Sequence, residues 1–484
     1  MNKKSPLLTA GLLVTLTGCT LAPQYHRPEV GGVTPPAWPE GAAYQAAPVA
    51  TNAPSVPDIG WREFFTDERL QQVIALAVTN NRDLRIAALN VERARALYNI
   101  QRGELLPSVG AAGTGSKVST PADLSSTGSR LTSERYDVNL GVTAWEIDFF
   151  GYIRNLKDRA LEEYLATEQA RRSAQIALVS SVASAYLTLA ADLENLTLAE
   201  TTLEAQQSSY GLIKRRNDLG LIPDIDVYRA QTQVDSALRD VARFTQRVAL
   251  GENTLNLLVG CPIPSELLPI TLADIHPPMD IVAGIPSDVL LRRPDVLQAE
   301  GMLKAANADI GAARAALFPR ISLTATYGIA SAELSDLFKG GQNTWSFAPR
   351  VTMPIFDTRI WAALRATKVQ RKIVLAQYEK AIQSSFREVA DALAVRGSVD
   401  REVSAQVSLV HAVSETHRLS NSRYDKGIDS YLSVLDSQRN LYATQQALVY
   451  LNLEKVVNQV RLYAVLGGGW KMSPAQATCA EEKR

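Results

Sequence analysis

Few residues in this chain have the type and spacing that catalytic or metal chemistry requires. No two of its histidines stand four residues apart, the spacing with which a helix holds one metal ion through two imidazoles. The stretch GTGSK at 113–117 is too short for a phosphate-binding loop. We therefore expect no catalytic residue, no bound metal and no enzyme activity. The histidines are His26, His276, His411 and His417.

One cysteine does stand where covalent chemistry is expected. Two lysines precede an apolar stretch at 7–17 that is too short to cross a bilayer. It ends in Leu16-Thr17-Gly18-Cys19, which resembles a bacterial lipobox, where the thiol takes a diacylglyceryl group and the amine freed by cleavage is acylated. We expect a signal peptide over 1–18 and a palmitate-type lipid on Cys19, since several acyl chains anchor stably. Thr20, rather than Asp, follows the cysteine, and by resemblance to bacterial lipoprotein sorting this implies onward transport to the outer membrane.

Composition excludes several classes of protein. Lys+Arg and Asp+Glu are equal at 50 each in 484 residues, so no charge excess favours nucleic acid. No run of about 18 apolar residues appears, so we expect no transmembrane helix and infer that strands make any membrane crossing. Cys261 and Cys479 show no paired spacing, and we expect neither to matter structurally.

The stretch YDVNLGVTAWEI at 136–147 alternates apolar and polar residues, as a strand with one apolar face does. Residues 152–210 then contain neither Gly nor Pro, which predicts a very long helix that follows the strand directly. We expect Asp137, Asn139 and Thr143 on the wet face.

Before that strand, residues 19–60 are rich in Pro, Ala and Gly and predict an extended tether. Asp67 is the expected N-cap of one helix that runs from about 68 to 106. A strand should follow, with a long loop over 113–133. Beyond the long helix, Gly220 is the expected left-handed turn residue of a helical hairpin.

The same plan then repeats. Four pairs of matching residues are separated by 212 or 207 positions, far longer than a solenoid repeat. The pairs are Asp83 and Asp295, Pro107 and Pro319, Gly220 and Gly427, Gly260 and Gly467. The expected organisation is a signal peptide (1–18), a lipidated tether (19–60), a first repeat (61–260, β-hairpin about 107–147, helical hairpin about 150–258), a proline-rich connector (261–286), a second repeat (287–467, β-hairpin about 319–354, helical hairpin about 358–466) and a tail (468–484).

Four strands cannot close a barrel, and a bilayer tolerates no unpaired strand edge. A cyclic homo-oligomer would close it, and three copies would supply twelve strands. A soluble sheet packed on one face and a soluble coiled-coil stalk are the alternatives for the strands and the helices. The lipobox, together with Trp145 and Trp345 near strand ends, favours the membrane. The predicted fold class is thus an α+β membrane channel: four strands per protomer in a shared β-barrel, continued by a long barrel of antiparallel coiled helices, with internal duplication. That the barrel is trimeric and has twelve strands rests on the resemblance described next.

At this point a family resemblance can be stated. WREFFTDERL, WEIDFFG, RYDKGIDSYLSVLDSQ and the terminal VLGGGW, with the lipobox and the duplicated plan, resemble the TolC-type outer membrane factors, in particular the lipidated branch that serves drug-efflux pumps. The resemblance covers residues 19–470. It implies a homotrimer in the outer membrane that extends into the periplasm and docks to a periplasmic adaptor and an inner-membrane transporter of the resistance-nodulation-division class.

The resemblance also implies a gate at the helical tips, beside the turns at Gly220 and Gly427. It places a tyrosine and an arginine there, bonded to an aspartate of the neighbouring hairpin; Tyr424, Arg423 and Asp226 match. Leu432 and Asp436 lie four apart on one helical face, so threefold symmetry would make of them an apolar ring and a carboxylate ring. Ser433 stands where the family pattern can carry a second acid.

The expected function is therefore a passive conduit that exports drugs and toxic small molecules and is gated at the periplasmic tips. Two other functions stay open from the sequence. One is the outer membrane channel of a type I protein secretion system. The other is a periplasm-spanning structural lipoprotein that forms no channel, with a lipid-anchored enzyme as a more distant alternative.

Overall fold

The computed structural model describes residues 20–28, 35, 37–44, 56–276, 278–279 and 287–470. The predicted signal peptide, Cys19, Cys479 and most of the predicted tail lie outside these residues. The chain forms two compact units. The sheet unit comprises Met1–Pro28, Asn90–Glu168 and Gln298–Tyr378, and the helical unit comprises Glu29–Leu89, Gln169–Leu297 and Glu379–Arg484.

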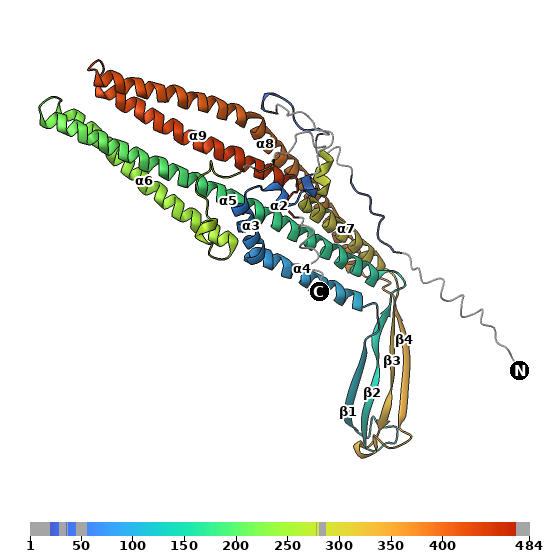
Figure 1. Cartoon of the computed structure of the whole chain (residues 1–484). Helices are drawn as coiled ribbons and strands as arrows, with labels where there is room; N and C mark the ends of the chain where they lie inside the picture. The colour runs from blue at the N-terminus through green and yellow to red at the C-terminus, as the bar shows by residue number, and fades with distance from the viewer. Residues whose placement is uncertain are drawn as a thin grey trace. The chain divides into compact units, whose positions relative to one another are not determined.

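One four-stranded antiparallel sheet lies in the sheet unit (Figure 1). Its strands follow chain order, β1 (Val109–Thr120), β2 (Leu131–Ile147), β3 (Arg320–Ser331) and β4 (Asn343–Thr352). In the described part of the chain, β1 and β4 each pair with one strand only, so both edges of the sheet carry unpaired backbone groups. The predicted loop over 113–133 is wrong at both ends, because β1 continues to Thr120 and β2 begins at Leu131. Its Gly and Ser residues are poor strand formers alone, but here twelve consecutive pairs join β1 to β2.

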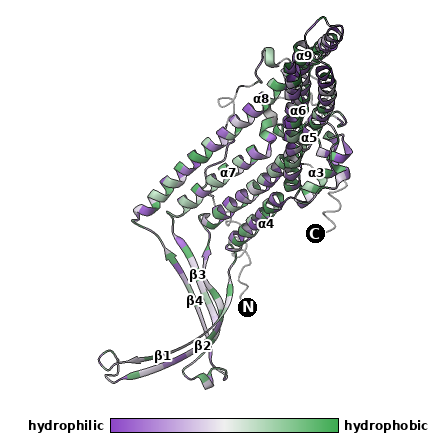
Figure 2. Ribbon diagram, turned by 90° about the vertical axis from the view of Figure 1, so that its left-hand side faces the viewer, coloured by the Kyte–Doolittle hydropathy of each residue, from purple (hydrophilic) through white to green (hydrophobic). Residues whose placement is uncertain are grey.

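The pairing register separates the sheet into an apolar and a polar face. Directly opposed residues share a face, and Leu140 of β2 lies opposite Tyr327 of β3, which lies opposite Trp345 of β4. These side chains are 59, 63 and 75% exposed in the single chain. Figure 2 shows hydrophobic and hydrophilic residues alternating along the strands. The apolar face includes Val109, Ala111, Tyr136, Val138, Leu140, Val142, Trp145, Ile147, Ile321, Leu323, Ala325, Tyr327, Ile329, Trp345, Phe347 and Val351.

A β-bulge changes the predicted faces near the end of β2. The register shifts between Val142 and Trp145, and Ala144 has a φ of 52°. The extra residue brings Trp145 and Ile147 onto the apolar face, where strict alternation had put Ala144. On the polar face, a Cβ at Gly141 would lie 2.4 Å from the Ala325 carbonyl oxygen. Only glycine fits between strands that approach so closely on that face.

Long helices make up most of the rest of the described chain. The helical hairpins are α5 (Tyr152–Asp218) with α6 (Asp224–Val259), and α8 (Thr358–Asp425) with α9 (Tyr431–Val465). Helices α4, α5, α7 and α8 have residues in both units. The remaining elements are α2 (Trp61–Phe64), α3 (Glu68–Asn80), α4 (Arg82–Gly103), α7 (Pro294–Ala315) and the 3-10 turns η2 (Ala42–Tyr44), η3 (Val56–Asp58), η4 (Ser265–Leu267), η5 (Ser287–Arg292) and η6 (Leu334–Asp336).

The first predicted helix is two helices. Asp67 caps α3 as expected, since its carboxylate accepts a hydrogen bond from the Leu70 amide at 2.8 Å. The chain breaks at Asn81, whose side chain accepts from the Leu84 amide at 2.8 Å and donates to the Leu258 carbonyl at 2.8 Å. Asn81 therefore caps α4 and ties it to the end of α6, a tertiary contact that no local pattern reveals.

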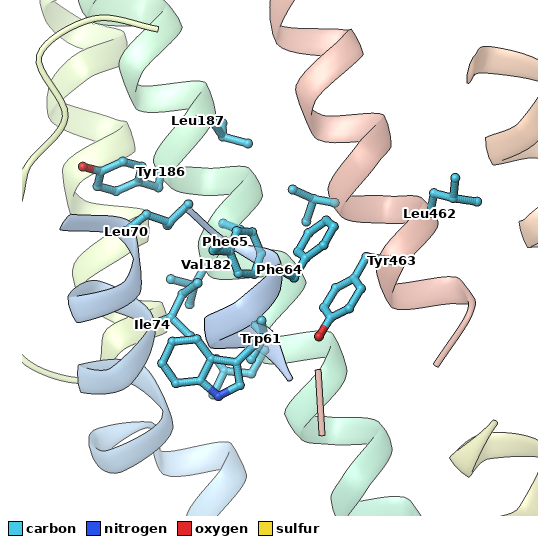
Figure 3. Packing of buried hydrophobic residues seen from close by; sticks show 14 of the residues in the cluster. Trp61, Phe64, Phe65, Leu70, Ile74, Val182, Tyr186, Leu187, Leu462 and Tyr463 are labelled. Carbon is cyan, nitrogen blue, oxygen red and sulfur yellow. The ribbon is translucent and has the colours of Figure 1, made fainter. Parts of the chain in front are cut away.

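The largest hydrophobic core lies in the helical unit (Figure 3). It brings together the WREFF segment near the start of the described chain and the end of α9 near its finish. The Phe64 ring of WREFF stacks on the Tyr463 ring at a centroid distance of 3.9 Å. The Tyr463 hydroxyl donates to the Ile59 carbonyl at 2.7 Å. A Cβ at Gly468 would lie 2.2 Å from the Tyr463 ring, so the glycines of VLGGGW make room for it.

The sequence predicted that no helix is apolar enough to cross a membrane, and α5 is an exception by composition. Helix α5 contains a stretch long and apolar enough to do so by composition. In the structure, 56% of that stretch is buried, as the core helix of a water-exposed domain would also be.

Candidate gate at the helical tips

The two hairpins turn through the same backbone geometry. Gly220 and Gly427 have φ angles of 73° and 71°, as the left-handed turn predicts. In the first turn the Leu221 amide donates to the Arg216 carbonyl at 2.9 Å, and in the second the Ile428 amide donates to the Arg423 carbonyl at 2.9 Å. The turns thus satisfy equivalent helix-terminal carbonyls in both hairpins.

The tips pack on each other through a small apolar cluster, here called the tip cluster. It contains Ile213 and Ala230 of the first hairpin and Tyr431, Val434 and Leu435 of the second.

Tyr424 lies at the edge of the tip cluster. Its ring centroid is 5.3 Å from that of Tyr431, and the Arg216 guanidinium lies 5.5 Å from its ring centre. Tyr424 therefore lies between its own hairpin partner Tyr431 and Arg216 of the first hairpin.

The charged residues pair differently from the prediction. Arg423 donates to both carboxylate oxygens of Asp429, at 2.6 and 3.0 Å, across its own turn. Asp226 accepts from Arg229 at 3.3 Å on its own helix. The predicted bond from Arg423 or Tyr424 to Asp226 is therefore not formed within this chain.

Leu432 and Asp436 lie on α9 beside the tip cluster. Leu432 is 41% exposed, and Asp436 pairs with Arg439 one turn further along the helix. Neither contributes to the packing between the hairpins, so both stay available to a surface outside this chain.

Two residues of the tip were missed in the sequence. Asp429 lies in the turn, six residues after Arg423, so no helical spacing relates the two residues. Tyr431 is 5% exposed, and its hydroxyl has no hydrogen-bond partner among the described residues. Burial, with Tyr424 and Asp226 nearby, raises the pKa of Tyr431 to about 12. The sequence did contain one signal, the position of Tyr431 directly after Ser430, the N-cap of α9.

The described residues hold no group of three or more His, Cys, Asp or Glu side chains that could bind a metal ion. His417 instead bridges α8 and α9 through Ser437 and is bonded to Asn421, both at 3.1 Å. Cys261 lies partly buried against the large core as a free thiol. The tip cluster consists of apolar and aromatic side chains that hold the hairpins together by packing, and it offers no chemistry for bond making.

Comparison with known proteins identifies the family of the whole chain. The family model described as outer membrane efflux protein matches residues 73–261 and 285–468. The toluene efflux pump outer membrane protein TtgC of Pseudomonas putida is 46% identical over 475 residues, which cover 98% of this chain and 97% of the relative. The outer membrane protein OprJ of Pseudomonas aeruginosa is 38% identical, with 97% of each chain covered. The open-state MtrE channel of Neisseria gonorrhoeae superposes with a TM-score of 0.80 at 34% identity, covering 94% of this chain and 99% of MtrE.

A duplicated strand-pair and helical-hairpin chain with this pattern of relatives is an outer-membrane efflux channel, a conduit that performs no enzymatic reaction. The chain belongs to the outer membrane efflux protein family. The resemblance stated from the sequence is confirmed, and so is the channel function, against the alternative of a structural lipoprotein.

Proposed function

We propose that three copies of this chain form a twelve-strand barrel in the outer membrane and a helical tunnel into the periplasm. The open sheet carries the proposal. Among the described residues each edge strand pairs on one side only, and one face exposes large apolar side chains such as Trp345 and Phe347 at 75 and 62%. Neighbouring copies would pair the edges, and lipid would cover the apolar face.

The proposed assembly includes two further partners and an anchor. A periplasmic adaptor would join the helical tips to an inner-membrane transporter of the resistance-nodulation-division class. Acyl chains on Cys19 would hold the mature N-terminus in the outer membrane. Since a close relative is named for toluene efflux, we propose apolar toxic small molecules and drugs as cargo. No relative described above points to protein secretion.

We further propose that the tips hold the channel closed at rest. Arg423, Tyr424, Asp226, Leu432 and Asp436 are the proposed gate residues. The Arg423–Asp429 pair and the contact of Tyr424 with Tyr431 would hold the turn of the second hairpin in shape. The Arg216 guanidinium over the Tyr424 ring would then join this turn to the first hairpin. Because the Arg423–Asp429 pair is exposed to solvent, each contact is weak on its own. Three copies together would hold the aperture shut yet yield to a docking interface.

Single-channel recording in planar bilayers tests this proposal. Arg423→Ser with Tyr424→Phe should raise the conductance of the purified protein severalfold, because the pair with Asp429 is lost and the tyrosine hydroxyl is removed. Arg418→Ser is the control, since Arg418 pairs with Glu415 on the exposed surface of the same helix. Equal conductance of the gate variant and the wild type would contradict the gate residues. A wild-type protein that never conducts would contradict the channel assembly itself.

A further inference from the structure

The first residues after the predicted lipidation site are bound to the fold. Residues 20–28, here called the strap, contain no helix or strand in the described structure, and they belong to the sheet unit. The sequence predicted a free tether for this segment. The prediction overlooked Tyr25 and Arg27, two side chains able to bind a helix face.

One face of α7 holds the strap along its whole length. Arg314 donates to the Leu21 carbonyl at 2.9 Å, and Asn307 donates to the Pro23 carbonyl at 2.7 Å. Glu300 accepts from Tyr25 and Arg27. Seven residues separate each α7 partner from the next, so all three lie on one side of the helix.

The lengths of the two segments match. Fourteen residues of helix span about 21 Å, and an extended chain from Leu21 to Arg27 spans about 20 Å. The strap therefore runs antiparallel to α7 in register, with a contact at every second strap residue.

Glu300 holds the far end of the strap. It is 4% exposed, and Arg27 donates to its two carboxylate oxygens at 3.1 and 2.5 Å. The Tyr25 hydroxyl donates to it at 3.2 Å, and Lys304 lies 3.4 Å away. A buried carboxylate is costly without partners. Because all but one of these partners belong to the strap, the acid is built to receive it.

The near end of the strap is fixed beside the sheet. The Thr20 hydroxyl donates to Asn155 at 3.0 Å, and Asn155 is 1% exposed in the first turn of α5. A Cβ at Gly311 would lie 2.8 Å from the Ala22 Cβ, so glycine lets the strap close on α7. Helix α5 begins five residues after β2 ends at Ile147. The strap thus begins at the level where the strands give way to helices, one peptide bond after Cys19.

We propose that the α7 face is a receptor for the mature N-terminus, and that it sets the depth of the lipid anchor relative to the sheet. The anchor and the sheet then approach the membrane as one rigid body, without a slack tether between them. This inference rests on the lipidation of Cys19 in the proposed function. Glu300, Asn307, Gly311 and Arg314 are positioning residues in it.

A linker placed on either side of the strap tests the inference. Six residues, Thr-Gly-Ser-Gly-Ser-Gly, inserted between Cys19 and Thr20 keep a threonine after the cysteine but free the anchor from the strap. The same six residues between Pro28 and Glu29 leave the anchor tied to α7 and serve as the matched control. We expect the first insertion to lower the amount of oligomer assembled in outer membranes at least about threefold, and the second to leave it at the wild-type level.

Incorporation of labelled palmitate separates a failure of the proposed lipidation from a failure of the strap inference. Labelled palmitate must enter both insertion proteins, and a protein without label would contradict the proposed lipidation rather than the strap. With label present, equal assembly of the two insertion proteins would overturn the inference.

Docking of the strap itself is measured by chymotrypsin cleavage after Tyr25 in the purified full chain. Loss of a charge-assisted bond should make Glu300→Gln about tenfold more sensitive. Asp309→Asn, on the same helix but paired with Arg159, should match the wild type. Equal cleavage of Glu300→Gln and wild type would contradict the receptor role of Glu300.

Discussion

Single buried charges join distant segments in both units, and each is saturated with partners. In the helical unit, Arg293 is 7% exposed. It donates to Asp295 at 2.7 Å, to Glu388 at 2.8 Å and to the Val465 carbonyl at 2.6 Å, and so ties the start of α7 to α8 and to the end of α9. In the sheet unit, Glu300 plays the same role with the opposite charge: it is buried and binds several partners from distant parts of the chain. Such groups stabilise the fold only while every partner is present.

The pH dependence of the strap follows from Glu300. Burial alone would raise its pKa, but hydrogen bonds from Arg27 and the charge of Lys304 outweigh burial and hold the pKa below its ordinary value of 4.5. The other groups that face it are Tyr25, Tyr378 and Glu162. Burial raises the pKa of Glu162, so that acid protonates first. Because the pKa of Glu300 is lower in the folded protein than in the unfolded chain, the ionised carboxylate stabilises the docked strap. This stabilisation is complete above the ordinary pKa of 4.5 and is lost as the pH falls through the pKa of the folded state.

We therefore expect the strap to stay docked at about pH 6 and to loosen once the pH falls below the ordinary glutamate value of 4.5. Hydrogen–deuterium exchange of the amides in residues 21–27, corrected for the intrinsic rate, measures this directly. Glu300→Gln should exchange fast across the whole range. Acid-induced loosening of the same size in Glu300→Gln would show that another group is responsible.

At the scale of elements, helix boundaries were predictable from the sequence where a glycine or a proline marks them. The first helical hairpin was expected from about residue 150, and α5 begins at Tyr152, directly after a glycine; α6 begins at Asp224, directly after a proline. The break at Asn81 was missed, since asparagine is tolerated inside helices and its partner, Leu258, is 177 residues away. The bulge at Ala144 was missed for a similar reason. One inserted residue leaves the local pattern almost unchanged, and only the pairing with β3 reveals it.

The repeated left-handed glycines allow a matched test of element stability. Gly260 and Gly427 have φ angles of 80° and 71°. A Cβ at Gly260 would lie 2.6 Å from the Asn80 carbonyl oxygen, whereas a Cβ at Gly427 meets nothing within 4 Å. Gly427→Ala should therefore cost about 1 kcal/mol of backbone strain, and Gly260→Ala clearly more.

Thermal unfolding followed by circular dichroism in detergent checks this order. The melting temperature should fall further for Gly260→Ala than for Gly427→Ala. Equal shifts would mean that the contact between the end of α6 and the α3–α4 break contributes little to stability.

At the scale of the whole molecule, the sheet cannot be understood from one chain. Leu140 is 59% exposed on the apolar face, while its neighbour Asn139 lies on the polar face. If neighbouring copies close a barrel, Leu140→Arg places a charge in lipid and should cost about 2–4 kcal/mol per site near the bilayer centre. The amount of assembled oligomer in outer membranes should then fall strongly.

Asn139→Arg is the matched control, because the same side chain would enter the water-filled side. It should assemble normally and shift the anion-to-cation selectivity measured in planar bilayers. Normal assembly of Leu140→Arg would place the apolar face away from lipid. Closure by three copies is the part of the fold that the sequence could suggest only through its family resemblance.

The strap also has a consequence for the order of events during synthesis. Its bonds to α7 join residues 273–293 positions apart in the chain. The strap is made near the start of synthesis, yet its binding site on α7 appears only after more than half of the chain has followed. Contacts of such long sequence separation form late. Docking of the strap is therefore a completion signal: a truncated or stalled chain that lacks α7 keeps a loose N-terminus, which proteases can recognise and remove.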